Sequence, residues 1–174
     1  MGKRALFLDR DGVINQLIEE KGKLRSPRCM DEFRYELGVL EFIREIKEMA
    51  FEVIVITNQP EVKRGLVTKE IVNDFHKKIS VDTGIYNFFI CWHDTYDNCD
   101  CRKPKPGLFF DAQKELKISL EDSYMIGDRD KDIIAAENAG CSGILYLHNN
   151  ITTTLYKHSF TSFSKILSFI QNKK

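Results

Sequence analysis

The amino-acid sequence predicts an α/β fold in which a mostly parallel sheet lies between two layers of helices. Three observations lead to this prediction. Short, continuous apolar runs alternate along the chain with stretches whose apolar residues recur at helical spacing. Strands that are apolar on both faces are typical of a parallel sheet covered by helices. The length of 174 residues suits one domain with a single hydrophobic core.

The apolar runs are the predicted strands, and they cover residues 4–8, 51–56, 88–91, 123–126 and 143–147. The predicted helices cover residues 38–50, 68–80, 106–116, 130–139 and 163–170. In the first helix, Leu40, Ile43 and Ile46 recur at helical spacing. Pro106 stands at the start of the third helix, and Gly140 follows the fourth, where glycine commonly ends a helix.

Residues 13–37 interrupt this alternation. They are polar, and Gly22 indicates a turn among them, so we expect a hairpin flap over a site at the edge of the sheet. Nothing in the chain is long enough to form a separate cap domain. We therefore predict that residues 1–174 form a single domain, with the flap at about 13–37 and a second functional loop at 91–103.

The composition is that of a soluble globular protein, with 43% hydrophobic and 30% charged residues. A net charge of zero disfavours a nucleic-acid-binding protein. No segment is predicted to be a secretory signal or to span a membrane, so we expect a cytoplasmic protein. Its five cysteines are then expected to be thiols or metal ligands rather than disulfides. We also expect a monomer.

Two acids, Asp9 and Asp11, directly follow the first predicted strand, and Gly12 allows the chain to turn there. Ligands of open α/β sheets bind at the carboxyl ends of the strands. The two acids could share a Mg²⁺ ion, which prefers oxygen ligands. Asp9 could then attack phosphorus and form an aspartyl-phosphate, while Asp11 first protonates the leaving oxygen and then activates water. The same run could also be no more than a solvated turn.

Polar residues after later predicted strands favour the chemical interpretation. Thr57 and Asn58 offer a hydroxyl and an amide to phosphoryl oxygens, although such a pair commonly belongs to a turn. Lys103 could hold the transferring phosphoryl group, and Arg102 could grip a substrate oxygen. The alternative for this basic run is a solvated turn.

The acidic run 127–132, Gly-Asp-Arg-Asp-Lys-Asp, follows the fourth predicted strand. We expect Asp128 to give the Mg²⁺ ion a further carboxylate ligand. Asp132 lies one helical turn further on and could support the site. We expect Asp130 to cap the helix that begins there, because acids are favoured at helix N-termini.

These motifs in this order resemble the haloacid dehalogenase superfamily. They are Asp-Arg-Asp-Gly at 9–12, Thr-Asn-Gln at 57–59, Arg-Lys-Pro at 102–104 and Gly-Asp-Arg-x-x-Asp at 127–132. Within the superfamily, the chain is similar to the branch that contains histidinol-phosphate phosphatases and D-glycero-D-manno-heptose-1,7-bisphosphate 7-phosphatases. The resemblance covers residues 4–147 as an ordered set of motifs, which is more specific than any one of them.

The resemblance implies a Rossmann-like three-layer fold without a large cap domain, and Mg²⁺-dependent hydrolysis of a phosphomonoester. It implies that Asp9 is the nucleophile and Asp11 the acid and base, and that Thr57 and Lys103 contact the phosphoryl group. Mg²⁺ would be held by Asp9, the backbone carbonyl of Asp11, and Asp128. Two positions depart from the pattern, because Val13 replaces a common threonine and Pro-Glu at 60–61 replaces a Ser-Gly pair. The second departure leaves the substrate open.

A second metal site is predicted in the loop 91–103. Cys91, His93, Cys99 and Cys101 match the ligand set of a closed, tetrahedral structural Zn²⁺ site. The branch of the superfamily named above carries a zinc loop at this place. The last cysteine directly precedes Arg102 and Lys103, so zinc would act on catalysis by holding the backbone that presents both cations. Four unrelated residues are the alternative interpretation.

The substrate is predicted to be a small phosphorylated metabolite. Features of the heptose enzymes, such as Arg64-Gly65, favour D-glycero-D-manno-heptose 1,7-bisphosphate, whose second phosphate Arg64, Arg102 and Lys105 could bind. The short zinc loop favours histidinol phosphate instead. A nucleic-acid 3′-phosphatase is a further alternative, which the zero net charge disfavours. A non-catalytic zinc- and phosphate-binding module is another, which the presence of Asp9 and Asp11 disfavours.

His76 lies in a predicted helix, and we expect it on the helix surface rather than as a ligand.

Overall fold

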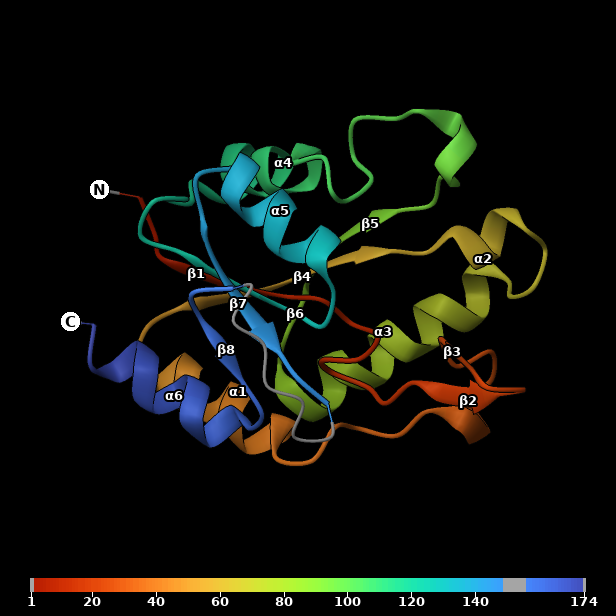
Figure 1. The fold of residues 1–174 in the computed structure, drawn as a ribbon, viewed down its shortest axis with the longest axis horizontal. Coiled ribbons are helices and arrows are strands. Elements are labelled where there is room, and N and C mark those ends of the chain that lie inside the picture. Colours follow the sequence, from red (N-terminus) through yellow and green to blue (C-terminus); the bar gives the residue numbers. More distant parts are fainter. Residues whose placement is uncertain (1, 149–155, 174) are drawn as a thin grey trace.

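Six parallel strands form one sheet in the computed structural model, which describes residues 2–148 and 156–173 (Figure 1). Within these residues, the strand order across the sheet is β5-β4-β1-β6-β7-β8. The strands are β1 (Ala5–Leu8), β4 (Glu52–Asn58), β5 (Asn87–Cys91), β6 (Tyr124–Gly127), β7 (Ser142–Tyr146) and β8 (Ser159–Phe160). The chain therefore starts in the middle of the sheet, extends it toward β5, and then returns to build the other half from β6.

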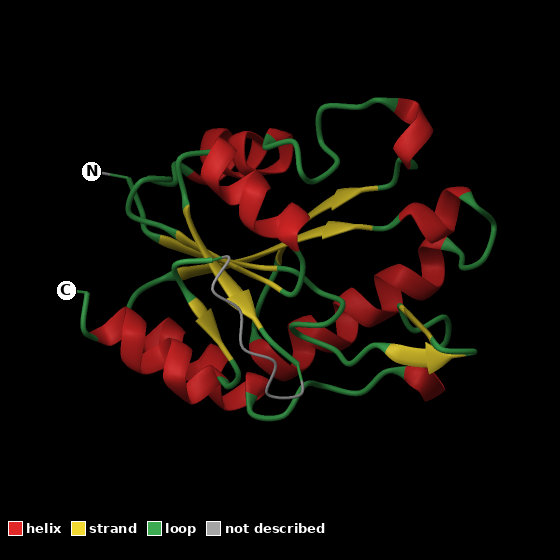
Figure 2. Cartoon of the chain, in the orientation of Figure 1, coloured by secondary structure: helices red, strands yellow, loops and turns green. Residues whose placement is uncertain are grey.

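Helices cover both faces of this sheet, as predicted (Figures 1 and 2). Leu6 and Leu8 of β1 belong to the apolar cluster that includes α1 (Val39–Glu48), α3 (Lys69–Thr83) and α6 (Phe163–Gln171). Ala5 and Phe7 point to the opposite face, where α4 (Gly107–Leu116) and α5 (Asp130–Asn138) supply the cluster. Strand β1 is thus buried on both sides, which explains its continuous apolar sequence.

The predicted strands and helices are all present, with boundaries that shift by a few residues. The prediction ended the second strand at residue 56, whereas β4 continues through Thr57 and Asn58 because these residues pair with Ile90 and Cys91 of β5. Hydropathy did not predict the one-turn helix α2 (Pro60–Lys63) or the short strand β8. Such short elements depend on tertiary partners more than on local sequence.

The segment 13–37 contains an antiparallel hairpin of β2 (Ile18–Glu20) and β3 (Lys23–Arg25). Arg25 pairs with Glu32 at 2.7 Å, within the same segment. Arg28 pairs with Glu61 of α2, also at 2.7 Å. We call residues 13–37 the flap, and this ion pair joins it to the sheet edge.

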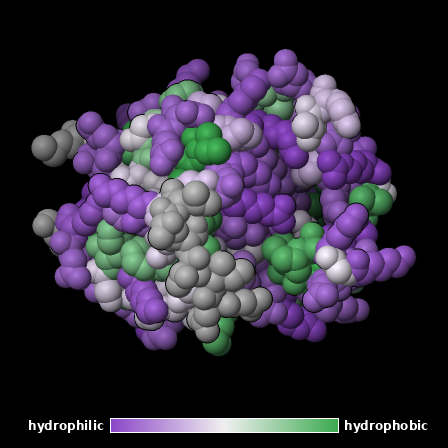
Figure 3. Space-filling view, in the orientation of Figure 1, coloured by the Kyte–Doolittle hydropathy of each residue, from purple (hydrophilic) through white to green (hydrophobic). Residues whose placement is uncertain are grey.

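Hydrophilic side chains predominate on the face shown in Figure 3, where hydrophobic ones occur in small, separate patches. This distribution fits a chain whose large apolar side chains are mostly packed in the two clusters beside the sheet. Among the described residues, no helix combines the length and the apolar character that crossing a membrane requires.

Candidate active site

The two central strands, β1 and β6, lie side by side although more than a hundred residues separate them. The order of the strands along the chain reverses between these two strands, and α/β sheets bind their ligands at the carboxyl side of such a switch point. Asp9 directly follows β1, and Asp128 directly follows β6. The topology therefore brings together the two acids that the sequence assigned to one site.

Carboxylate oxygens of Asp9, Asp128 and Asp132 all lie within 4.8 Å of one another. Burial, together with the charges of Asp9 and Asp132, raises the pKa of Asp128 to about 7. Oδ1 of Asp128 is buried and accepts no hydrogen bond from the described residues. This crowded and incompletely paired group has the donor chemistry that a hard divalent cation such as Mg²⁺ prefers.

Gly12 leaves room for this group. Its backbone has a φ of 85°, which favours glycine. A side chain at this position would also collide with the carboxylate of Asp128. The glycine of the first motif is therefore required both by the turn after β1 and by the acid after β6.

Lys103 is buried directly beside these acids. Its Nζ lies 2.7 Å from Asp132 Oδ1 and 3.0 Å from Asp9 Oδ1, and it donates to the carbonyl oxygen of Ile56 at 2.9 Å. Burial opposes the charge on Lys103, but the two carboxylates outweigh it and raise the pKa of the amine. The lysine is therefore a fixed cation against the candidate nucleophile.

Asp11 lies outside the group of three acids and has hydrogen-bond donors of its own. Arg10 Nη2 donates to both of its oxygens, at 3.0 and 2.9 Å, and Gln59 and Asn15 donate to it at 2.8 and 3.1 Å. Burial opposes ionisation of Asp11, but these three partners outweigh it and lower the pKa of the carboxyl. The charge of Asp11 is thus held by contacts of its own.

His76 is buried, which corrects the expectation of a surface residue. It is 6% exposed, and its ring stacks on Phe88 of β5 with 4.6 Å between the ring centroids. Its Nε2 lies 3.4 Å from Arg10 Nη1. His76 lies on the side of α3 that packs against the sheet. The apolar pattern of residues 68–80 identified only the apolar residues of that side, so it did not predict that a histidine would be buried there.

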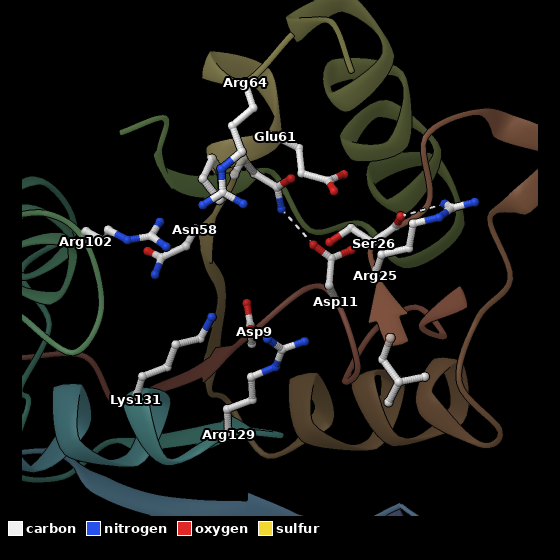
Figure 4. A pocket seen from close by; sticks show the side chains of 13 residues that line it. Asp9, Asp11, Arg25, Ser26, Asn58, Glu61, Arg64, Arg102, Arg129 and Lys131 are labelled. Atoms are coloured by element: carbon white, nitrogen blue, oxygen red, sulfur yellow. Dashed lines mark hydrogen bonds between the residues drawn. The ribbon is translucent and has the colours of Figure 1, made fainter. Parts of the chain in front are cut away.

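A cavity of about 210 Å³ opens above Asp9 and Asp11 (Figure 4). Residues from the flap, from the segment after β4, from the loop after β5 and from the start of α5 line it. Its charged groups are mostly cations, namely Arg25, Arg64, Arg102, Arg129 and Lys131. The cavity suits an anionic ligand placed against Asp9.

The predicted phosphoryl-binding residues lie at this cavity or directly behind it. Asn58 lines the cavity and holds the backbone of Lys103, donating to its carbonyl at 3.1 Å and accepting from its N–H at 3.2 Å. Thr57 is 1% exposed, and its hydroxyl accepts a hydrogen bond from Gln59 at 2.8 Å. Thr57 therefore lies behind the cavity wall rather than in it.

Of the three cations predicted to bind a second phosphate, two line the cavity and one does not. Arg64 and Arg102 line the cavity. Arg64 pairs with Asp94 at 2.5 Å, and Arg102 donates to the carbonyl of His93 at 3.1 Å. Lys105 is not among the cavity residues, because its amine binds Asp100 and Asn98 in its own loop. The structure therefore does not bring Lys105 to the cavity together with the other two cations.

The helix cap at the start of α5 also differs from the prediction. The structure places Arg129 at the cap position with extended backbone, and the carboxylate of Asp132 accepts a hydrogen bond from its N–H at 3.2 Å. Asp130 was the predicted cap. A residue three positions into the helix can reach back to the cap, so the carboxylate that binds Lys103 also closes the helix end.

The side chains of Cys91, His93, Cys99 and Cys101 form a compact cluster in the loop after β5. The sulfur atom of Cys101 lies 3.3 Å from that of Cys91, 3.5 Å from that of Cys99 and 3.3 Å from His93 Nδ1. Ligands about 2.0–2.3 Å from a tetrahedral centre are separated by roughly 3.5 Å. The four atoms therefore have the spacing of a tetrahedral metal site.

Sequence reasoning missed Arg10, Gln59, Arg129 and Lys131. Arg10 and Gln59 lie inside the recognised motifs, but an arginine beside two acids gives no sign that it is fully buried. Arg129 and Lys131 stand at the start of a predicted helix, where a charged residue is usually solvated. Only the position of that helix over the cavity brings them to the site.

Comparisons with known proteins agree on one family. The model of the HAD-hydrolase-like family matches residues 100–163. The D-glycero-beta-D-manno-heptose-1,7-bisphosphate 7-phosphatase of Helicobacter pylori is 35% identical over 153 residues, which are 84% of this chain and 85% of that protein. The Yersinia pestis enzyme of the same name is 35% identical over 76% of this chain and 73% of its own.

A solved structure shares the whole architecture. It is the crystal structure of the D,D-heptose 1,7-bisphosphate phosphatase from B. bronchiseptica, complexed with magnesium and phosphate. Its TM-score is 0.83 and its sequence identity 26%, and the match covers 98% of this chain and 99% of the other.

Proposed function

Because the chain belongs to the D,D-heptose-bisphosphate phosphatase family of the haloacid dehalogenase superfamily, we propose that it removes the 7-phosphate of D-glycero-D-manno-heptose 1,7-bisphosphate. The chain is a phosphatase of this superfamily. The observation that supports the proposed chemistry most directly is the position of Asp9 beside Lys103 and Asp128, on the floor of a cationic cavity.

Asp9 is the proposed nucleophile. Its contacts with Lys103 and with the backbone N–H of Arg10 both fall on Oδ1. Oδ2 is therefore the oxygen available to attack phosphorus. In the first step an Asp9 oxygen bonds to phosphorus and the bond between phosphorus and the sugar oxygen breaks. That oxygen takes the proton of Asp11, which must be protonated at this step against the contacts that lower its pKa.

The second step frees the enzyme. Asp11, now a carboxylate, takes a proton from water as the water oxygen bonds to phosphorus. The bond between phosphorus and Asp9 breaks, which releases phosphate and restores the Asp9 carboxylate. The contacts from Arg10, Gln59 and Asn15 favour the ionised form of Asp11 and so suit this step.

Mg²⁺ fits the acidic group beside Asp9. The buried Oδ1 of Asp128, which has no hydrogen-bond donor among the described residues, and the raised pKa of this acid fit a carboxylate that would bind a divalent cation. Asp9, Asp128 and the backbone carbonyl of Asp11 would hold the ion, because both oxygens of Asp132 are engaged, one by Lys103 and the other by the N–H of Arg129. When bound, Mg²⁺ supplies positive charge to the phosphoryl oxygens.

Zn²⁺ is the metal that we propose for the loop after β5. Three thiolates and one imidazole fill all four positions of a tetrahedral site, which suits a structural rather than a catalytic ion. The five cysteines, all of which the structure describes, are free thiols, so the four in this cluster are available as ligands. We also propose that the protein is a cytoplasmic monomer.

The heptose substrate is favoured over histidinol phosphate by the names of the relatives described above. A bisphosphate also gives a role to the cations of the cavity rim, since Arg64 and Arg102 lie apart from the acids that surround Asp9. Membership in a phosphatase family excludes the alternative of a non-catalytic module.

Turnover by the purified protein tests this proposal. With Mg²⁺, we expect hydrolysis of heptose 1,7-bisphosphate with a kcat/KM at least about tenfold above that for histidinol phosphate, because the cationic rim recognises a second phosphate. Asp9→Asn is expected to lose roughly a thousandfold or more in kcat. The matched control Asp111→Asn changes an exposed acid on α4 and is expected to retain activity. Equal kcat/KM values for the two substrates would contradict the proposed substrate. An active Asp9→Asn variant would contradict the proposed role of Asp9 as nucleophile.

A further inference from the structure

Lys131 is the second residue of α5 and lines the cavity. Figure 4 shows its amine extending from the helix toward Asp9 and Asn58. Among the described residues it has no hydrogen-bond or ion-pair partner. The side chain thus presents a cation with free N–H donors to the space directly above the proposed nucleophile.

The other cavity cations have partners within the protein. Arg25 binds Glu32, Arg64 binds Asp94, Arg102 binds the carbonyl of His93, and Arg129 lies 3.5 Å from Asp128. The three N–H donors of Lys103 are directed at Ile56, Asp9 and Asp132. Lys103 would have to give up one of these contacts in order to bind a phosphoryl oxygen, whereas Lys131 would give up none.

A lysine at position 131 is unfavourable for the stability of the folded chain. The first turn of a helix carries the positive end of the helix dipole, which repels a cation. Burial and the charge of Lys103 also lower the pKa of the amine, although Asp9 opposes this. Residues that break local rules without a compensating partner commonly belong to functional sites.

We propose that Lys131 binds the reacting phosphoryl group directly, as a second lysine beside Asp9. The inference rests on the proposed phosphatase function and adds to it a substrate-binding residue at the reacting centre. A phosphoryl group above Asp9 would supply the hydrogen-bond acceptor that the amine lacks among the described residues. The interaction would strengthen as charge spreads over the phosphoryl oxygens in the transition state.

Substitution of Lys131 tests the inference through the affinity for inorganic phosphate. Calorimetry with Mg²⁺ present is expected to show that Lys131→Met weakens phosphate binding about 10- to 100-fold, the value of a charge-assisted hydrogen bond. We expect a similar fall in kcat/KM for the sugar phosphate and partial recovery of both in Lys131→Arg. The Tm of Lys131→Met should be equal to that of the native chain or higher, because an unpaired cation leaves the helix N-terminus.

Lys114→Met is the matched control, because Lys114 is an exposed lysine on α4 whose loss changes the net charge equally. It is expected to leave phosphate affinity unchanged. If Lys131→Met binds phosphate within twofold of the native chain, or loses affinity only together with a lower Tm, the inference is overturned. Failure to hydrolyse the heptose bisphosphate would overturn the proposed substrate and would leave the phosphate measurement interpretable.

Discussion

At the scale of the residue, Asp11 keeps its charge inside the protein because a fully buried guanidinium lies against it. Arg10 has 0% exposure and contacts both oxygens of Asp11. It also binds Oε1 of Gln59 and lies over the ring of Phe75, 5.3 Å from its centroid. Since Gln59 directly follows β4 and Phe75 lies in α3, Arg10 links the nucleophile loop to two other parts of the fold.

We predict that Arg10→Met lowers the free energy of unfolding by about 3–5 kcal/mol, because it leaves Asp11 buried without its cation. Urea unfolding measures this change. In the Asp11→Asn background the same substitution should cost much less, since no buried charge is then left unpaired. Additive costs in this double-mutant cycle would contradict the pairing. Arg44→Met, on the exposed side of α1, is the control and should change stability little.

At the scale of the element, α2 connects the surroundings of the cavity. Glu61 binds Arg28 of the flap, and Arg64, which directly follows α2, binds Asp94 of the loop 91–103. Lys63 pairs with Asp97 of the same loop. Helix α2 and Arg64 therefore hold the flap and the loop 91–103 in one arrangement, which apolar periodicity could not have predicted.

We predict about one Zn²⁺ per chain by elemental analysis, and its loss in Cys99→Ser. The loop that ends in Lys103 would then lose its constraint, so we expect a fall in kcat of roughly tenfold or more with the Asp9 chemistry otherwise intact. Cys29→Ser removes an exposed thiol and serves as the control. A metal-free protein that stays folded and fully active would contradict the zinc site.

At the scale of the whole molecule, the proposed Mg²⁺ site joins two strands that are distant in sequence. Asp9 and Asp128 lie at the ends of β1 and β6, and their charges repel when no cation lies between them. An ion that binds both acids therefore stabilises the central strand pair of the sheet. Its binding free energy adds to that of folding.

We predict that Mg²⁺ at a hundred times its Kd raises Tm by about 5–10 °C, from roughly 2.7 kcal/mol of linked stabilisation. Differential scanning calorimetry measures this shift. Asp128→Asn should have an equal or higher Tm without Mg²⁺, since it removes one repelling charge, and should lose most of the shift. Asp111→Asn should keep the full shift. An undiminished shift in Asp128→Asn would show that the ion binds elsewhere.

The sequence by itself determined the fold class and most of the site. Strand and helix periodicities are local, and the motif acids and Lys103 each follow an apolar run, so their meeting at one edge of a parallel sheet could be inferred. The cluster of Cys91, His93, Cys99 and Cys101 was predictable for the same reason, because its ligands lie within a few residues of one another.

Only the tertiary structure decided which partner each charged group has. Asp132 binds Lys103 as well as capping α5, Arg10 is buried against Asp11, Lys105 stays in its own loop, and Lys131 faces the cavity unpaired. Ion pairing and burial depend on distances between segments that are far apart in the chain. The local pattern around an arginine or a lysine is the same whether the folded chain surrounds it with water or with acids.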